Sequence, residues 1–115
     1  VKGVRTNRDR VDFLRSFGWE VAEEPLATQE MVIPQEFDDS YAQYIDLQRQ
    51  QGFDLERYAG KRAKRYSYEI LHSPSGETGV QANLLLYKTT VIGGEVLSPR
   101  LDGFLHGLSM PEDGG

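Results

Sequence analysis

The sequence predicts an α+β domain, in which an antiparallel sheet of about four to five strands carries two main helices packed on one face. Three segments of the last third, residues 66–71, 80–88 and 91–98, have the alternating apolar pattern of antiparallel strands. Two earlier segments, residues 7–17 and 38–51, place apolar side chains along one stripe of a helix. Helices that precede a strand meander are typical of the α+β class.

Length and composition indicate one soluble globular domain over residues 1–115, with residues 109–115 as an irregular tail. A chain of 115 residues can bury roughly two thirds of its unfolded surface. Its 38% hydrophobic and 27% charged residues lie well away from the composition of disordered chains. Because the chain has no cysteine, disulfides, thiolate metal sites and cysteine nucleophiles are excluded.

The overall charge argues against nucleic acid as a partner. Acidic residues number 18 against 13 Lys and Arg, and the net charge of −5 opposes attraction to phosphate backbones. No apolar run approaches the roughly 20 residues that a membrane helix needs. The chain begins at Val1 without a methionine, so we expect any export signal or membrane anchor to lie upstream.

The first helix is predicted from its ends. Thr6 or Asn7 is suited to cap a helix over residues 7–17, and Gly18 supplies a left-handed stop. After Gly18 the apolar period changes from that of a helix to that of a strand. A short strand at the sheet edge is expected over residues 19–23, where Pro25 ends it.

The middle of the chain predicts a second short strand and a second helix. Residues 28–33 are extended up to Pro34, whose ring disfavours helical geometry in the residue before it. Asp38 or a neighbouring polar residue caps the helix over 38–51. One more helical turn is expected over residues 54–58.

The predicted meander follows. Tyr66, Tyr68 and Ile70 share one strand face and are assigned to the core. Turn-forming residues over 73–79 join this strand to the next one. Lys88 and Thr89 then have the length of a tight hairpin turn, although neither residue prefers a positive φ.

A pair of glycines, Gly93 and Gly94, falls inside the last predicted strand. Glycine weakens a strand interior because it has no side chain to pack. Its presence there indicates a β-bulge or a close approach of another part of the chain.

Several short motifs occur in a fixed order: FGWEV (17–21), QGFDL (51–55), YAGK (58–61), ANLL (82–85), IGGEV (92–96) and LDGFLHGL (101–108). Together they resemble a bacterial family classed as domain-of-unknown-function family 4830, over residues 6–108. Members of that family usually carry an N-terminal membrane anchor or signal segment in Gram-positive bacteria. The resemblance therefore implies that this chain is the exported part of a longer protein, anchored through a segment absent from this chain. The family has no established activity, so no catalytic role transfers to any residue.

Asp102 and His106 are the weak catalytic candidates. A spacing of four places both side chains on one helix face, where they can form a carboxylate–imidazole pair or supply two metal ligands. A third ligand is not evident, and the flanking glycines Gly103 and Gly107 disfavour a helix. A capping Asp beside a hydrogen-bonded His is the favoured interpretation, and no metal or cofactor is expected.

The only concentrated positive charge is a run comprising Lys61, Arg62, Lys64 and Arg65. Such a run can hold an anionic polymer. It also occurs as a solvated strand end, where Lys and Arg discourage edge-to-edge association. Because the whole chain is acidic, the second interpretation is favoured.

Our first functional hypothesis is a non-enzymatic, extracytoplasmic domain that binds a protein or a cell-envelope component through an exposed sheet face or edge. A hydrolase or metal-dependent enzyme using Asp102 and His106 is one alternative. Binding of an anionic polymer through residues 61–65 is the other.

Overall fold

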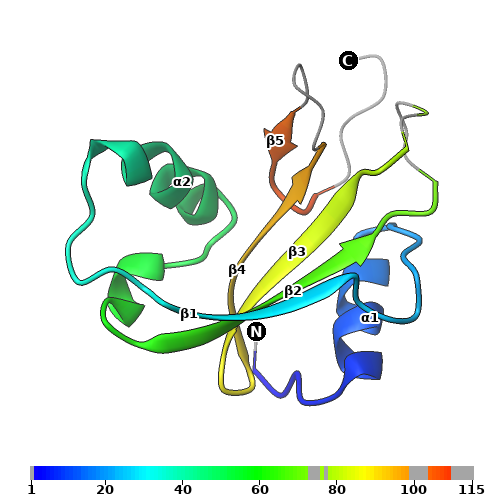
Figure 1. The fold of residues 1–115 in the computed structure, drawn as a ribbon, viewed down its shortest axis with the longest axis horizontal. Helices are drawn as coiled ribbons and strands as arrows, with labels where there is room; N and C mark the ends of the chain where they lie inside the picture. Colours follow the sequence, from blue (N-terminus) through cyan, green and yellow to red (C-terminus); the bar gives the residue numbers. More distant parts are fainter. Residues whose placement is uncertain (1, 73–75, 77, 99–103, 110–115) are drawn as a thin grey trace.

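The computed structural model contains a five-stranded antiparallel sheet of order β1-β2-β3-β4-β5, with helices α1 and α2 and one 3-10 turn, η1 (Figure 1). It describes residues 2–72, 76, 78–98 and 104–109. The α+β class and the strand number are confirmed. The predicted turn over 73–79 and the tail over 109–115 lie largely outside the described residues. The elements are α1 (Asn7–Arg15), β1 (Ala27–Val32), α2 (Asp39–Gln50), η1 (Leu55–Tyr58), β2 (Arg62–Glu69), β3 (Gln81–Tyr87), β4 (Thr90–Leu97) and β5 (Leu105–His106).

Helix α1 begins at the predicted cap. The Thr6 side chain accepts a hydrogen bond from the Asp9 backbone, and the Asp9 carboxylate accepts one from the Thr6 backbone, which is a capping box. Backbone hydrogen bonds from Arg5 and Thr6 lower the pKa of Asp9. The helix ends at Arg15, two residues earlier than predicted, and Gly18 has a left-handed φ of 99°.

The two short strands predicted before α2 have different outcomes. Residues 28–33 correspond to β1, which pairs along its whole length with β2. The segment 19–23 forms only an isolated bridge between Val21 and Ile70. Trp19 nevertheless joins the core, with its indole N–H donating to the Leu108 carbonyl at 2.5 Å. The segment therefore makes only two backbone hydrogen bonds around this bridge, from Ala22 N–H to the Glu69 carbonyl and from Leu71 N–H to the Glu20 carbonyl, and does not form a strand.

The β3–β4 hairpin has the predicted tight turn and the predicted irregularity. Tyr87 pairs with Thr90, and the turn residue Lys88 adopts a left-handed φ of 55°. Further along, Leu85 pairs with Gly93 while Leu86 pairs with Val91. One extra residue, Ile92, is therefore bulged on β4.

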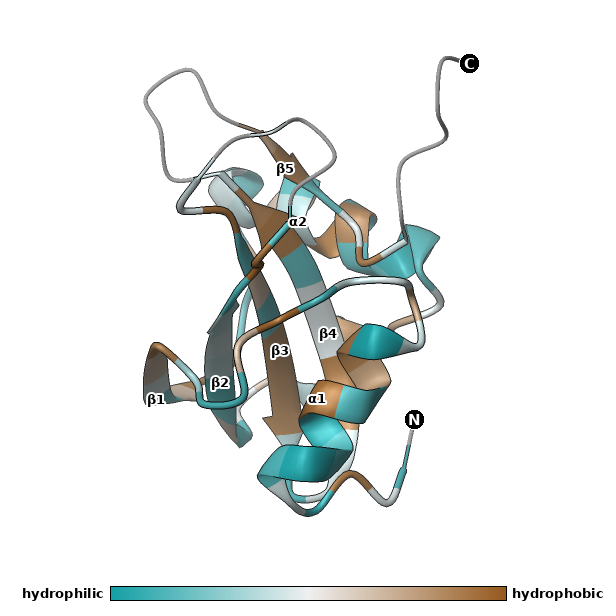
Figure 2. Cartoon of the chain, turned by 90° about the vertical axis from the view of Figure 1, so that its right-hand side faces the viewer, coloured by the Kyte–Doolittle hydropathy of each residue, from teal (hydrophilic) through white to brown (hydrophobic). Residues whose placement is uncertain are grey.

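The two helices lie on opposite faces of the sheet, which corrects the expectation that both cover one face. Consecutive strand residues point to opposite faces, and Leu84 packs in the core with α1 whereas Leu85 packs in the core with α2. The strands β3 and β4 are buried on both faces, so each face needs its own cover. Figure 2 shows hydrophobic residues along much of β3, and such a continuous apolar run is typical of a strand covered on both sides.

Helix α2 also covers the outer edge of β4. The Gly94 backbone N–H donates to Gln48 Oε1 at 2.8 Å, and Gln51 Nε2 donates to the Gly94 carbonyl at 2.8 Å. Gln51 Oε1 accepts from the Leu108 backbone at 2.7 Å. Two glutamine side chains thus satisfy backbone groups that β5, only two residues long, does not reach.

We predict that Gly94→Ala destabilises the fold by about 2 kcal/mol, because overpacking a full core forces neighbours to move. A Cβ at this position lies 2.6 Å from Leu108 Cδ1 and 3.0 Å from the backbone oxygen of Asn83. Gly93→Ala is the matched comparison, since a Cβ there meets its nearest neighbour, Gln48 Oε1, at the longer distance of 3.2 Å. Urea unfolding measures both variants, and an equal loss in the two contradicts the packing argument.

Candidate anion-binding groove

An open groove lies on the α1-side face of the sheet, at the end where β2 begins and β3 finishes. Its volume is about 570 Å³. It gathers side chains from four separate stretches of the sequence. The lining residues are Arg5, Glu30, Gly60, Lys61, Arg62, Ala63, Lys64, Tyr66, Leu86, Tyr87 and Lys88.

Strand alternation explains which members of the basic run reach the groove. Arg62 and Lys64 are two residues apart in β2, so both side chains lie on the same face as Tyr66. Their cross-strand partners on β1 are Val32 and Glu30. Arg62 and Lys64 are both exposed, as is Lys61, which precedes the strand.

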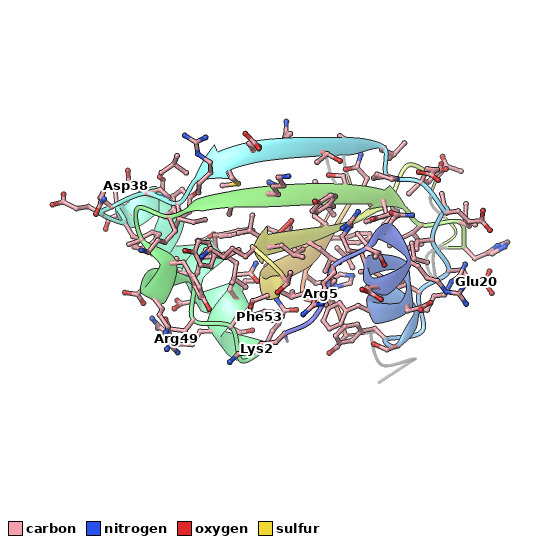
Figure 3. All side chains as sticks on the ribbon, turned by 90° about the horizontal axis from the view of Figure 1, so that it is seen from below. Lys2, Arg5, Glu20, Asp38, Arg49 and Phe53 are labelled. Carbon is pink, nitrogen blue, oxygen red and sulfur yellow. The ribbon has the colours of Figure 1, made fainter. Side chains whose placement is uncertain are left out.

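Two more cations arrive from distant parts of the chain. Lys88 is held at the β3–β4 turn, and Arg5 (labelled in Figure 3) precedes α1. The backbone N–H of Val4 donates to the carbonyl of Thr89 at 2.9 Å. This bond ties the N-terminal segment to the turn, so Arg5 and Lys88 line one groove.

The groove concentrates positive charge in an acidic protein. Five of the 13 Lys and Arg residues line it, against one of the 18 acidic residues, Glu30. Within the described part of the chain, none of these five cations is in an ion pair. Unneutralised like charges around one concave surface raise the local potential, which attracts anions.

Tyr66 forms one wall of the groove, and α1 holds it in place. The Arg10 guanidinium lies over the Tyr66 ring, 3.8 Å from its centroid, and Arg10 Nε donates to the Tyr68 hydroxyl at 3.0 Å. That hydroxyl donates in turn to Asn7 Oδ1 at 2.6 Å. Burial raises the pKa of Tyr68. A face of the Tyr66 ring is thereby already occupied by a cation.

Arg65, the fourth member of the predicted basic set, points to the opposite face. Its Nη2 donates to Glu95 Oε2 at 2.9 Å, and the Tyr44 hydroxyl donates to Glu95 Oε1 at 2.6 Å. The Glu95 side chain is 1% exposed. Burial, with the Glu95 charge as the second cause, raises the pKa of Tyr44 well above its usual range. The ion pair links β2 to β4, and the Tyr44 hydroxyl links α2 to the same carboxylate. Arg65 is therefore not part of the groove.

Sequence reasoning missed this buried polar cluster. Asn83 lies directly opposite Glu95 in the β3–β4 ladder and is 1% exposed. Neither polar atom of the Asn83 amide has a hydrogen-bond partner among the residues that the structure describes. The available signal is a polar residue inside an otherwise apolar strand, since Asn83 and Glu95 each interrupt such a run.

His106, one of the two catalytic candidates, lies in β5 opposite Val96. Its ring is stacked with Trp19 and Phe104, at centroid distances of 6.1 and 5.1 Å, and its Nδ1 lies 2.7 Å from the Gly107 carbonyl. The Val96 position faces the α1-side core, whereas Glu95 faces α2, so the structure does not bring His106 and Glu95 together.

The other candidate, Asp102, lies outside the described residues, so its pairing with His106 stays a prediction. Among the described residues, no group of three or more His, Cys, Asp or Glu side chains is arranged to hold a metal ion.

The family model described as Domain of unknown function (DUF4830) matches residues 13–96, and the chain belongs to this family. The match covers most of the chain and includes β1, β2, β3 and all of β4 but its last residue. No curated protein and no solved structure matches the chain. In the described residues, none of the helices has the length and apolar character needed to cross a bilayer.

We predict that Arg65→Met destabilises the domain by about 2 kcal/mol, because the buried Glu95 carboxylate loses its charge partner. The double variant Arg65→Met, Glu95→Leu recovers part of that loss, since it leaves no uncompensated buried charge. Urea unfolding of both variants measures the two effects. If the double variant is the less stable of the two, the ion pair is not the source of the loss.

Proposed function

We propose that this domain is a non-catalytic binding module whose groove holds an anionic polymer. The observation that carries the proposal is the gathering of five cations around one groove of a protein with a net charge of −5. These cations, which form no ion pair among the described residues, are Arg5, Lys61, Arg62, Lys64 and Lys88. Positive charge concentrated at one place raises both the rate at which anions associate and the affinity with which they bind.

The exposure and spacing of the cations favour a polymer over a single small anion. A pocket for one phosphate buries its cations and converges them on one point, whereas Lys61, Arg62 and Lys64 are all exposed. Arg62 and Lys64, two residues apart in β2, are separated by about 7 Å along the strand. A row of separated positive charges is complementary to a polymer whose negative charges recur along its length.

The same geometry favours a flexible phosphate or carboxylate polymer over nucleic acid. Proteins that bind single-stranded nucleic acid stack bases on free aromatic rings. The Tyr66 ring in the groove is covered on one face by Arg10, and Tyr87 packs against Tyr58 with ring centroids 5.4 Å apart. The overall acidity also opposes binding to a long phosphate backbone outside the groove.

We extend the proposal to location and partner. An anionic polymer of the cell envelope is a ligand of this chemistry, and the family resemblance leads us to expect an exported, membrane-anchored protein. The domain then acts outside the cytoplasmic membrane, where its groove contacts the polymer. Fractionation of cells that express the full-length protein tests the location separately from the binding.

We predict that the protein is retained on a polyanionic resin at low salt and that Arg62→Glu with Lys64→Glu abolishes the retention. Each reversal replaces an attraction in the groove by a repulsion. The matched control is Arg15→Glu with Arg57→Glu, which changes the net charge equally through two exposed residues outside the groove. The salt concentration at elution is the measurement.

The two double variants separate a groove from a general charge effect. Elution of the control close to the wild type, with loss only in the groove variant, supports the proposal. Unchanged retention of the groove variant overturns the proposal. An equal loss of retention in both variants also overturns it, because the net charge of the protein then accounts for binding to the resin. Soluble polyglycerol phosphate, polyglutamate and single-stranded DNA, used as competing eluants, then rank the classes of ligand.

A further inference from the structure

Lys88, one of the five cations that line the groove, has a backbone conformation that disfavours its own side chain. Its φ is 55°, and it is the one residue other than glycine with a positive φ in the part of the chain that the structure describes. Lys88 and Thr89 form the turn between β3 and β4, because Tyr87 pairs with Thr90. Glycine adopts a positive φ without steric penalty, whereas a residue with a Cβ does not. Lysine at this position therefore lowers the stability of the folded state.

The sheet places a second cation opposite Lys88. Lys64 pairs with Leu86 in the antiparallel ladder between β2 and β3. The same register, continued by two residues, places Arg62 opposite Lys88, and both residues line the groove. Like charges directly opposite one another on neighbouring strands are destabilising. Within the described part of the chain neither Arg62 nor Lys88 is in a salt bridge, so no such contact offsets their repulsion.

Two contacts hold Lys88 at the end of the groove. Its Nζ lies 5.4 Å from the centroid of the Tyr87 ring, which is within the range of a cation–π contact. The carbonyl of the next residue, Thr89, accepts a hydrogen bond from the Val4 backbone N–H at 2.9 Å, and Val4 is buried in the core. The turn is thereby attached to the core, and a charge whose position is already restricted loses less entropy when it binds an anion.

We propose that Arg62 and Lys88 form one subsite that binds a single oxyanion group of the polymer, an inference that rests on the proposed function of the groove. An oxyanion between two cations offsets their repulsion with two attractions. Opposite residues of antiparallel strands have Cα atoms about 5 Å apart, so both side chains can reach the same group. Both side chains are exposed, so the polymer can continue beyond the subsite to the other three cations.

The two side chains of the subsite recognise the oxyanion in different ways. The planar guanidinium of Arg62 can donate two parallel hydrogen bonds to a phosphate or a carboxylate, whereas the Lys88 ammonium acts as a point charge. Phosphate and carboxylate groups share this chemistry. Strained backbone conformations are concentrated at ligand-binding sites, where the strain accompanies a function. The subsite thus accounts for a lysine at a turn position where glycine is the more stable choice.

We predict that Lys88→Gly raises the urea midpoint of unfolding of the free protein. Glycine removes the steric penalty at this φ, and loss of the ammonium removes the repulsion with Arg62. Lys88→Arg is the matched comparison, because it retains both penalties, and it is expected to unfold at the wild-type midpoint. A midpoint of Lys88→Gly at or below that of the wild type shows that the position carries no penalty and overturns the inference.

A double-mutant cycle tests whether Arg62 and Lys88 bind the same group. Arg62→Gln and Lys88→Gln are each expected to raise the Kd for at least one of two soluble polymers, polyglycerol phosphate and polyglutamate, by about three- to fivefold, the scale of one exposed ion pair. Because the two residues share a contact, the double variant is expected to raise the Kd by less than the product of the two factors. Isothermal titration calorimetry measures each Kd.

Lys64→Gln with Lys88→Gln is the matched control cycle. Lys64 lies opposite Leu86 and not opposite Lys88, so the factors of these two variants are expected to multiply. Factors that multiply in the cycle of Arg62 and Lys88 as well overturn the shared subsite.

The outcomes separate this inference from the proposed function. If Arg62→Glu with Lys64→Glu loses retention on the resin but Lys88→Gln binds both polymers as the wild type does, the subsite is overturned and the function of the groove stands. Unchanged retention of that groove variant overturns the function and the subsite together. Weaker binding of one polymer only by Lys88→Gln supports the subsite and assigns its oxyanion to phosphate or to carboxylate.

Discussion

The contact between α2 and β4 at Gly94 is the constraint on which the rest of the architecture depends. A strand without a side chain at this point lets Gln48 and Gln51 hydrogen-bond its backbone while Leu108 fills the opposite face. The β4 side is thereby closed by side chains and by β5. Since β2 and β3 are interior strands, β1 is left as the one long edge among the described elements.

Strand alternation divides the basic run of β2 between two different tasks. Lys64 and Arg65 are neighbours in the sequence, yet Lys64 reaches the open groove and Arg65 reaches the buried Glu95. The buried pair needs each partner, because an isolated charge in that position is strongly unfavourable. The cations in the groove have no such partner within the described residues, so their energy falls when an anion arrives.

Local signals in the sequence predicted much of the fold. Thr6 located the start of α1, Gly18 placed its end two residues too late, and alternation located β3 and the second half of β2. The placement of both helices on one face was wrong. An amphipathic stripe indicates that a helix packs against the sheet, but it does not indicate which face of the sheet the helix covers. The continuous apolar run at residues 84–86 was the overlooked sign that both faces are covered.

The groove could be predicted only in part, because its members come from distant segments. The run 61–65 was visible as a local concentration of charge, but Arg5 and Lys88 join it only through the bond between Val4 and Thr89. Conversely, Arg65 belongs to the run in the sequence but not to the groove, because it pairs with Glu95 on the other face of the sheet. The sequence does not reveal this pairing, since the two residues are 30 positions apart. A charge run in a sequence thus predicts a basic surface, whereas the ladder decides which residues form it.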